Sequence, residues 1–200
     1  MIQQEKPAMV FLQETKCNNT VLEAILNRIW PGCRSVSVDA SGASGGLAIL
    51  WNPQVYYLED FHASHYVIQA TFHLIGTNIH GHLSNVYFPQ ELQNKMDLLE
   101  TLSVLNSVRR YPLWLCGGDF NMISTLGERS GGRLRLEGES IGFRDFIHRN
   151  QLIDLQTSND IYTWTNKRRG PQHIASRLDR FLMSGNAIHL GGAFHASIMP

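Results

Sequence analysis

Four short polar clusters in the sequence combine residue types that can carry out hydrolysis. Together they supply carboxylates, an amide and a phenol, a set typical of a hydrolytic site when its members converge on one place. The clusters are Gln13-Glu14-Thr15, Asn85-Val86-Tyr87-Phe88, Gly118-Asp119-Phe120-Asn121 and Arg177-Leu178-Asp179-Arg180. The candidate site residues are therefore Glu14, Tyr87, Asp119, Asn121 and Asp179.

Each cluster lies within an apolar segment or directly after one. Ala8–Leu12 is a short apolar run that predicts a buried strand, and Pro112–Cys116 is another. The segment Ser176–Ser184 alternates as a strand does. Ligand sites in α/β proteins favour strand ends, because side chains there project into a crevice from a fixed backbone. We therefore expect the five candidates to face one cleft.

Taken singly, each candidate also has a structural explanation. Glu14 suits a solvated strand exit, and Asp119 suits the cap of a turn beside glycine. Tyr87 suits the edge of a core with its hydroxyl satisfied. Asp179 lies between two arginines and suits a local ion pair with them. Only the combination of the four clusters favours catalysis.

The rest of the chain predicts a single α/β domain over residues 1–200, with helices outside β-rich layers. Residues 33–88 have the texture of short strands separated by Gly, Asn and Pro turns. Pro89 suits the first turn of a long helix that continues through Arg109, and residues 142–152 predict another helix. A further helix is expected near residues 21–29, with its apolar residues on one face: Val21, Leu22, Ile25, Leu26 and Ile29.

Five motifs in a fixed order carry a family resemblance: FLQET, NVYFP, GGDFN, YTWTN and RLDRFLMS. This order closely resembles the endonuclease/exonuclease/phosphatase superfamily, and the nearest branch looks like the apurinic-type endonuclease domain of plant non-LTR retrotransposons. The resemblance runs from about Pro7 to about Ser184, and GDFN followed by RLDRF is its specific pairing. It implies a four-layer α/β sandwich, in which two packed mixed β-sheets are flanked by helices. It also implies Mg²⁺-dependent hydrolysis of phosphodiester bonds.

The resemblance implies a role for each matching residue. Glu14 matches the metal-binding glutamate, and Tyr87 matches the tyrosine that contacts the phosphate. Asp119 matches the aspartate that orients or deprotonates the attacking water, and Asn121 matches the amide that holds the transition state. Asp179 matches the aspartate that orients a catalytic histidine. These types suit phosphoryl transfer, because Mg²⁺ prefers hard oxygen ligands and an amide donates to a phosphoryl oxygen without adding negative charge.

Two motifs of the superfamily are absent from the 200 residues. Only Met1–Lys6 precede the FLQET strand, so the superfamily's first strand, which ends in a metal-site Asn, is missing. No Ser-Asp-His follows RLDRF, and His189 and His195 are not expected to replace its histidine. We therefore expect a domain truncated at its N- and C-terminal strands, with weak Mg²⁺ binding and impaired hydrolysis.

Composition sets wider limits. A chain with 43% hydrophobic and 17% charged residues can bury a core, which excludes a disordered chain. Its apolar runs are far shorter than the roughly 20 residues that span a bilayer, and its first residues lack the pattern of a secretion signal. Three cysteines without C-x-x-C spacing favour a reducing compartment. We expect an intracellular protein, nuclear or cytoplasmic, with no membrane contact and no obligate protein partner.

A basic segment follows an aromatic residue in the second half of the chain. Lys167, Arg168 and Arg169 follow Trp164, as in a loop that contacts DNA, although a solvated hairpin tip explains them equally well. Residues 1–100 carry 5 basic and 9 acidic residues, whereas residues 101–200 carry 12 basic and 8 acidic ones, so the second half permits a polyanionic partner.

Three hypotheses for the function stay open at this point. The leading one is a retrotransposon-derived endonuclease that acts on DNA. The alternatives are a phosphatase of the same superfamily that acts on a small phosphoester, and an inactive remnant that binds nucleic acid weakly.

Overall fold

A computed structural model describes residues 2–42, 45–132, 138–190 and 194–199. The chain forms two compact units. The first consists of Met1–Tyr87 and Trp114–Gly118, and the second of Phe88–Leu113 and Asp119–Pro200. The single-domain organisation expected from the sequence stays a prediction. Among the described residues, no helix is both long enough and apolar enough to cross a membrane.

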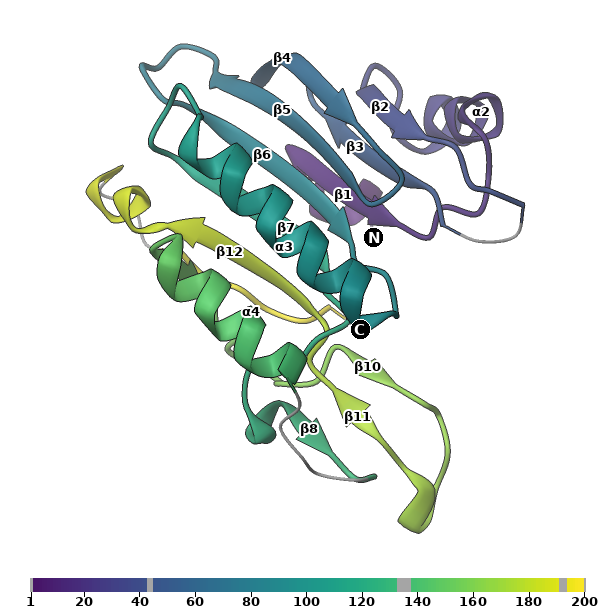
Figure 1. The fold of residues 1–200 in the computed structure, drawn as a ribbon. Coiled ribbons are helices and arrows are strands. Elements are labelled where there is room, and N and C mark those ends of the chain that lie inside the picture. The colour runs from purple at the N-terminus through teal and green to yellow at the C-terminus, as the bar shows by residue number, and fades with distance from the viewer. Residues whose placement is uncertain (1, 43–44, 133–137, 191–193, 200) are drawn as a thin grey trace. The chain divides into compact units, whose positions relative to one another are not determined.

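The first unit contains two sheets (Figure 1). The smaller sheet is antiparallel in the order β1 (Met9–Gln13), β3 (Leu47–Trp51), β2 (Arg34–Val38). The larger has neighbouring strands in the order β4 (Tyr56–Ala63), β5 (Val67–Leu74), β6 (His80–Tyr87) and β7 (Trp114–Asp119). β4, β5 and β6 pair as antiparallel hairpins, as the dense turn signals between residues 33 and 88 predict.

Strand β3 forms the centre of the first unit. All five of its residues are buried, because it packs against helix α2 (Asn19–Ile29) on one face and against β5 and β6 on the other. Leu22 and Leu26 of α2 pack on Ala48 and Leu50. The sequence pattern predicted a broader apolar face for this helix. Instead, Leu22 and Leu26 form an i, i+4 pair that is sufficient to cover so small a sheet. The other apolar side chains of the helix are exposed: Val21, Ile25 and Ile29.

The second unit is built around two long helices. α3 (Leu92–Ser107) packs on α4 (Gly138–Arg149), and α4 packs on β9 (Leu152–Asp154), which pairs antiparallel with β12 (Asp179–Ser184). A small antiparallel sheet has the order β10 (Trp164–Thr165), β11 (Ala175–Ser176), β8 (Arg129–Ser130). The remaining elements are short helices: α1 (Ile2–Glu5) in the first unit, and Leu126–Glu128, Gly170–Gln172 and Gly185–Leu190 in the second.

Two predicted elements have different bounds in the structure. The long helix begins at Leu92 after Glu91, so Pro89 lies before its first turn. The predicted strand Ser176–Ser184 is broken between β11 and β12. The break occurs because the backbone N–H groups of Leu178 and Asp179 donate to the Thr163 hydroxyl, each at 3.0 Å, instead of continuing one ladder.

Candidate functional site

Glu14 and Tyr87 form a hydrogen-bonded pair in the first unit. The Tyr87 hydroxyl donates to Glu14 Oε1 at 2.6 Å, and Lys16 Nζ lies 3.3 Å from Glu14 Oε2. The hydrogen bond from Tyr87, followed by the contact with Lys16, holds the pKa of Glu14 below its usual value. The pair joins two residues that are 73 positions apart in the sequence. Glu14 is therefore an ionised carboxylate that is oriented while still half exposed to solvent.

The backbone at Glu14 leaves the strand in the left-handed region, with φ of 51°. The turn is held by the N–H groups of Thr15 and Lys16, which donate to the carbonyls of Gly46 and Gly45. A Cβ at Gly46 would lie 2.2 Å from Thr15 Oγ1, so this approach requires glycine.

Asn85 ties the two sheets of the first unit together beneath this pair. Its side chain is fully buried, donates to the carbonyls of Leu12 and Ala48 at 3.0 and 2.8 Å, and accepts from Gln13 Nε2 at 2.5 Å. Gly118 allows β7 to pass beside these groups, because a Cβ there would lie 2.1 Å from the Val86 carbonyl oxygen. The strand ends that carry Glu14 and Tyr87 are thus fixed to each other.

In the second unit, backbone hydrogen bonds bring three motifs side by side. The Phe88 N–H donates to the Asp119 carbonyl at 2.8 Å, and the Phe120 N–H donates to the Leu178 carbonyl at 2.9 Å. Phe120 is fully buried and stacks on Phe88 with 5.2 Å between ring centroids. Phe120 therefore anchors the segment between its two polar neighbours, while Leu178 directly precedes Asp179.

Asp119 and Asn121 are held by local hydrogen bonds. Asp119 Oδ1 accepts from the Asn121 N–H at 2.8 Å, and Asn121 Nδ2 donates to the Phe88 carbonyl at 2.8 Å. Asn121 has a φ of 49°, so it also adopts the left-handed conformation. The Asp119 contact is the turn cap that the sequence offered as the structural explanation. The same contact orients the carboxylate, so the two interpretations are compatible.

Lys95 of α3 donates a hydrogen bond to the turn at Asn121. Its side chain is 5% exposed, and Nζ donates to the Asn121 carbonyl at 2.8 Å and to Glu139 Oε2 of α4 at 2.7 Å. Sequence reasoning missed this residue. A signal was present, because Lys95 lies on the same helical stripe as Leu98, Leu99 and Leu102, where a solvated lysine has no place.

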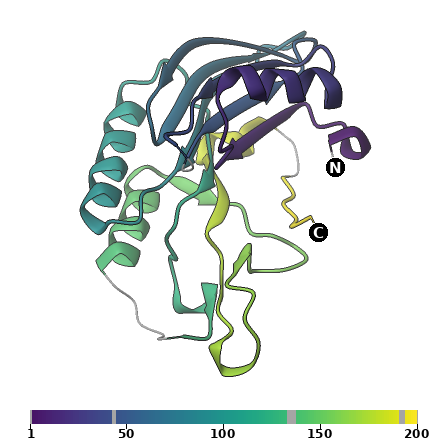
Figure 2. The ribbon, with the colours of Figure 1, turned by 90° about the vertical axis from the view of Figure 1, so that its right-hand side faces the viewer.

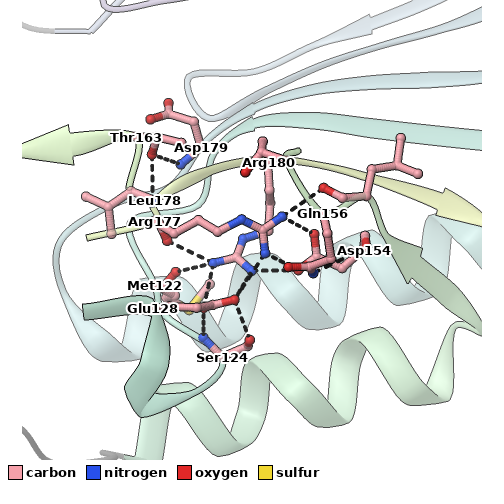
Figure 3. A network of polar contacts seen from close by, with 12 residues as sticks. Met122, Ser124, Glu128, Asp154, Gln156, Thr163, Arg177, Leu178, Asp179 and Arg180 are labelled. Atoms are coloured by element: carbon pink, nitrogen blue, oxygen red, sulfur yellow. Dashed lines mark hydrogen bonds and ion pairs between the residues drawn. The ribbon is translucent and has the colours of Figure 1, made fainter. Parts of the chain in front are cut away.

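The two arginines that flank Asp179 do not bind it. Arg177 and Arg180 are buried and share two carboxylates, Glu128 and Asp154 (Figure 3). The shortest contact joins Arg177 Nη2 to Asp154 Oδ1 at 2.6 Å, and Arg180 Nη1 lies 2.7 Å from Asp154 Oδ2. Burial opposes the charge on Glu128, but the hydrogen bond and charge of Arg180 outweigh it and lower the pKa of Glu128 to about 2. The alternative of an ion pair between Asp179 and its neighbours is therefore wrong.

The Asp179 side chain points away from this ion cluster, toward Thr163 (Figure 3). Asp179 is exposed at the start of β12, yet partial desolvation by its surroundings raises the pKa of its carboxyl, and the hydrogen bond with Thr163 and the charge of Arg180 oppose the rise. Asp179 and Thr163 line a hollow of about 480 Å³, whose wall also includes His195. Nε2 of His195 lies 3.1 Å from the Ser158 hydroxyl oxygen. Thr163, in the YTWTN motif, is a second residue whose positioning role the sequence alone did not reveal.

The four candidate DNA-binding residues lie together on the hairpin that joins β10 to β11, which extends beyond the rest of the second unit (Figure 2). Trp164 is 46% exposed, and Lys167, Arg168 and Arg169 are exposed in the turn. Asn166 shapes this turn, because its Oδ1 accepts from the N–H groups of both Arg168 and Ile174 at 3.1 Å. The hairpin thus presents three cations and an indole on a structured tip.

Comparison with known proteins identifies the family. A sequence model of the Endonuclease/Exonuclease/phosphatase family matches residues 1–195. The chain belongs to this family. The resemblance inferred from the five motifs is therefore confirmed. A search of curated protein sequences finds no match.

Solved structures of similar fold include both nucleases and phosphatases. The endonuclease domain of TRAS1, a telomere-specific non-LTR retrotransposon, matches with a TM-score of 0.67 and 15% identity, over 94% of this chain and 78% of that one. A mannosyl-6-phosphatase of Bacteroides thetaiotaomicron matches at 0.63 and 12% identity, over 92% and 74%. D. rerio TDP2, complexed with a single-stranded DNA product, matches at 0.61 and 12%, over 92% and 73%. The α/β sandwich predicted for this chain is the fold of the Endonuclease/Exonuclease/phosphatase family.

The family generally depends on a divalent metal ion. Among the described residues, no group of three or more His, Cys, Asp or Glu side chains is arranged to hold one. Glu14 nevertheless fits Mg²⁺ as a single ligand, because it is an oriented, ionised and solvent-accessible oxygen donor. Mg²⁺ usually keeps several waters and takes only one or two carboxylates from the protein.

The structure groups the predicted site residues into two sets. Glu14 and Tyr87 are joined directly in the first unit. Asp119, Asn121 and Asp179 are carried by segments joined through backbone hydrogen bonds in the second. Convergence of all five on one cleft stays a prediction.

Proposed function

We propose that this family member hydrolyses phosphodiester bonds of DNA in a Mg²⁺-dependent reaction. The observation that carries the proposal is the pair of backbone hydrogen bonds from Phe88 to Asp119 and from Phe120 to Leu178. Through them, the GGDFN and RLDRF motifs lie on neighbouring segments, and the buried Phe120 holds the two segments together.

Asp119 and Asn121 divide the work on water and phosphate. The Asp119 carboxylate, oriented by the Asn121 N–H, aligns the attacking water and accepts its proton. The Asn121 amide has two N–H groups, and the bond to Phe88 uses one of them. The other donates to a phosphoryl oxygen as negative charge develops there.

Asp179 serves proton exchange at the same site. Its carboxyl is exposed at the start of β12 and lines a hollow, so it can contact a group bound there. A carboxyl placed in this way suits the orientation of a group that transfers a proton near the leaving oxygen. Thr163 holds the carboxyl and the backbone of Asp179 in place.

Glu14 would hold Mg²⁺, and the single O–H of Tyr87 would fix the direction of this carboxylate before substrate binds and turn to the phosphate afterwards. When bound, the metal ion supplies charge neutralisation to the phosphoryl oxygens. Lys16 lies beside Glu14 and adds a positive charge at the same edge.

The β10–β11 hairpin favours DNA over a small phosphoester. Its three cations can pair with successive phosphates, and exposed Trp164 offers a face on which a base can stack. The similar structures named for DNA processing, the TRAS1 endonuclease domain and TDP2 with its DNA product, support the same substrate class.

A plasmid-nicking assay with added Mg²⁺ tests the proposal. Asp119→Asn keeps the shape of the side chain but removes its basicity, so nicking should fall about 10²-fold or more. The matched control is Asp145→Asn, which removes an exposed carboxylate of α4 and should leave nicking unchanged.

Two results would overturn the proposal. One is Mg²⁺-dependent nicking that survives Asp119→Asn. The other is release of phosphate from a sugar phosphate without any nicking, which would instead favour the phosphatase alternative, the activity printed for the Bacteroides relative.

A further inference from the structure

Two histidines face each other across the β5–β6 hairpin of the first unit, and neither has a role in the proposed hydrolysis. His73 and His80 are direct partners in the strand register. The Leu74 N–H donates to the Ile79 carbonyl at the next position, so the histidines occupy a pair without cross-strand hydrogen bonds of its own. Side chains are closest at such pairs. The two imidazole centroids lie 4.4 Å apart.

Glu59 of β4 fixes the tautomer of His73. Glu59 Oε1 lies 2.7 Å from His73 Nε2, and an ionised carboxylate can only accept a hydrogen bond. Nε2 of His73 therefore carries the proton, and Nδ1 of the neutral ring carries the lone pair. The ring of Tyr57 packs against the other side of His73 with 5.9 Å between centroids, which restricts its rotation.

The Nδ1 atoms of His73 and His80 lie 2.5 Å apart. The facing Nδ1 atoms can share one proton, when one ring donates its Nδ1–H to the other, or bind one metal ion, when both rings carry their proton on Nε2. Zn²⁺, Ni²⁺ and Cu²⁺ favour imidazole nitrogen, whereas Mg²⁺ favours oxygen. Two Zn–N bonds of about 2.0–2.1 Å place their nitrogens about 3 Å apart or slightly more, which a small rotation of the His80 ring supplies.

We propose that His73 and His80 form a two-imidazole site for a divalent transition-metal ion of the Zn²⁺, Ni²⁺ and Cu²⁺ class, with Glu59 as its orienting carboxylate. The site resembles in its chemistry the carboxylate–histidine–metal arrangement in which the outer nitrogen donates to an acid. His73 and Glu59 are both partly open to solvent, so water completes the coordination shell. His82, the next imidazole on this sheet face, has its Nδ1 3.5 Å from the Thr71 hydroxyl.

Isothermal titration of the untagged 200-residue chain with NiCl₂ or ZnCl₂ tests the site. We expect one ion per chain at the tightest step, undiminished by millimolar Mg²⁺. His80→Asn should lower the affinity of this step at least tenfold. Glu59→Gln should lower it about tenfold while leaving both metal-binding nitrogens in place. The matched control, His148→Asn on α4, should leave the affinity unchanged.

A second measurement does not depend on how the variants fold. Electron paramagnetic resonance of the unsubstituted chain with one equivalent of Cu²⁺ should show coupling to two imidazole nitrogens. The proposal is overturned if His80→Asn binds the ion as tightly as the unsubstituted chain. Absence of binding in the unsubstituted chain would overturn it equally, since it would mean that only a proton bridges the two rings.

Discussion

At the scale of single residues, the site depends on contacts that set the charge and direction of a few polar groups. Glu14 shows this most simply, because one phenolic hydrogen bond both orients its carboxylate and lowers its pKa. Removing that bond should therefore change the pH range in which the carboxylate is charged.

The substitution Tyr87→Phe tests this dependence. Without the hydroxyl, the pKa of Glu14 should rise toward its usual value. A carboxylate loses its charge as the pH falls through its pKa, so the acid limb of Mg²⁺-dependent activity should move to higher pH. A pH–rate profile or a ¹³C NMR titration of Glu14 measures the shift. The same acid limb in Tyr87→Phe and the unsubstituted chain would contradict the assignment, and Tyr57→Phe, a tyrosine exposed on β4, is the control.

Lys95 makes a second prediction at this scale. Lys95→Met removes both donors and leaves the Asn121 carbonyl and the Glu139 carboxylate without them. A buried acceptor left without its donor lowers the free energy of unfolding by about 1–3 kcal/mol. Because the Asn121 turn loosens, turnover should fall more than DNA affinity does.

Urea unfolding and single-turnover nicking measure the two effects. The exposed Glu100→Gln, on the same helix, should change neither. A stability loss without any fall in turnover would show that Lys95 supports the fold alone.

The sequence predicted the chemical identity of the site better than its supports. Asp119, Asn121 and Asp179 could be found because they follow apolar runs and recur in an ordered set of motifs. Lys95, Asn85 and Thr163 could not be assigned their roles, because their partners lie far away in the sequence. Arg180 gave a faint signal, since it lies on the same face of β12 as the buried residues Leu182 and Ser184.

At the scale of elements, the buried cluster of Arg177, Arg180, Glu128 and Asp154 determines how β12 begins. It draws two arginines inward, so that the residue between them, Asp179, projects the other way (Figure 3). Arg180 also lies 5.0 Å above the ring of Phe143 in α4, which links the strand to the helix. The cluster joins β12 to its neighbouring strand β9 and to the short helix Leu126–Glu128, which lies outside that ladder.

Breaking the cluster at Glu128 should be costly. Glu128→Gln leaves buried arginine charge only partly compensated, which costs about 3–5 kcal/mol of unfolding free energy. The pKa of Glu128 is lowered in the fold to about 2, so its contribution is complete above the pKa of the unfolded chain. That contribution is lost as the pH falls toward about 2.

Urea unfolding at pH 7 and at several values between about 5 and 2 measures both effects. The unsubstituted chain should lose stability on acidification more steeply than Glu128→Gln. The exposed Glu23→Gln in α2 is the control. Equal stability of Glu128→Gln and the unsubstituted chain at neutral pH would contradict the role of the cluster.

At the scale of the whole molecule, a formal charge of zero conceals an uneven distribution. The acidic excess lies in residues 1–100 and the basic excess in residues 101–200, where the β10–β11 hairpin carries three adjacent cations. Attraction to a polyanion therefore depends on local charge and should be sensitive to salt.

Replacing Lys167, Arg168 and Arg169 together by alanine tests this. For double-stranded DNA, each lost phosphate contact should reduce the slope of log affinity against log salt by about 0.9. Fluorescence anisotropy with a labelled duplex between about 50 and 200 mM salt measures it. Arg28→Ala with Arg34→Ala, two exposed arginines of the first unit, should leave the slope unchanged, and an unchanged slope in the hairpin variant would rule out the hairpin as the contact.

Asn85 has a consequence for how the chain selects its native arrangement. Its three hydrogen-bond partners belong to β1 and β3, while Asn85 itself belongs to β6. If β6 slipped by one residue, the Asn85 side chain would turn to the opposite face of the sheet. Its amide would then lose the two carbonyl acceptors, which is costly for a buried polar group. An apolar residue at this position would pack almost equally well in several registers. A single amide thus makes the packing of the two sheets specific, because its hydrogen bonds form in the native register and are lost in the neighbouring ones.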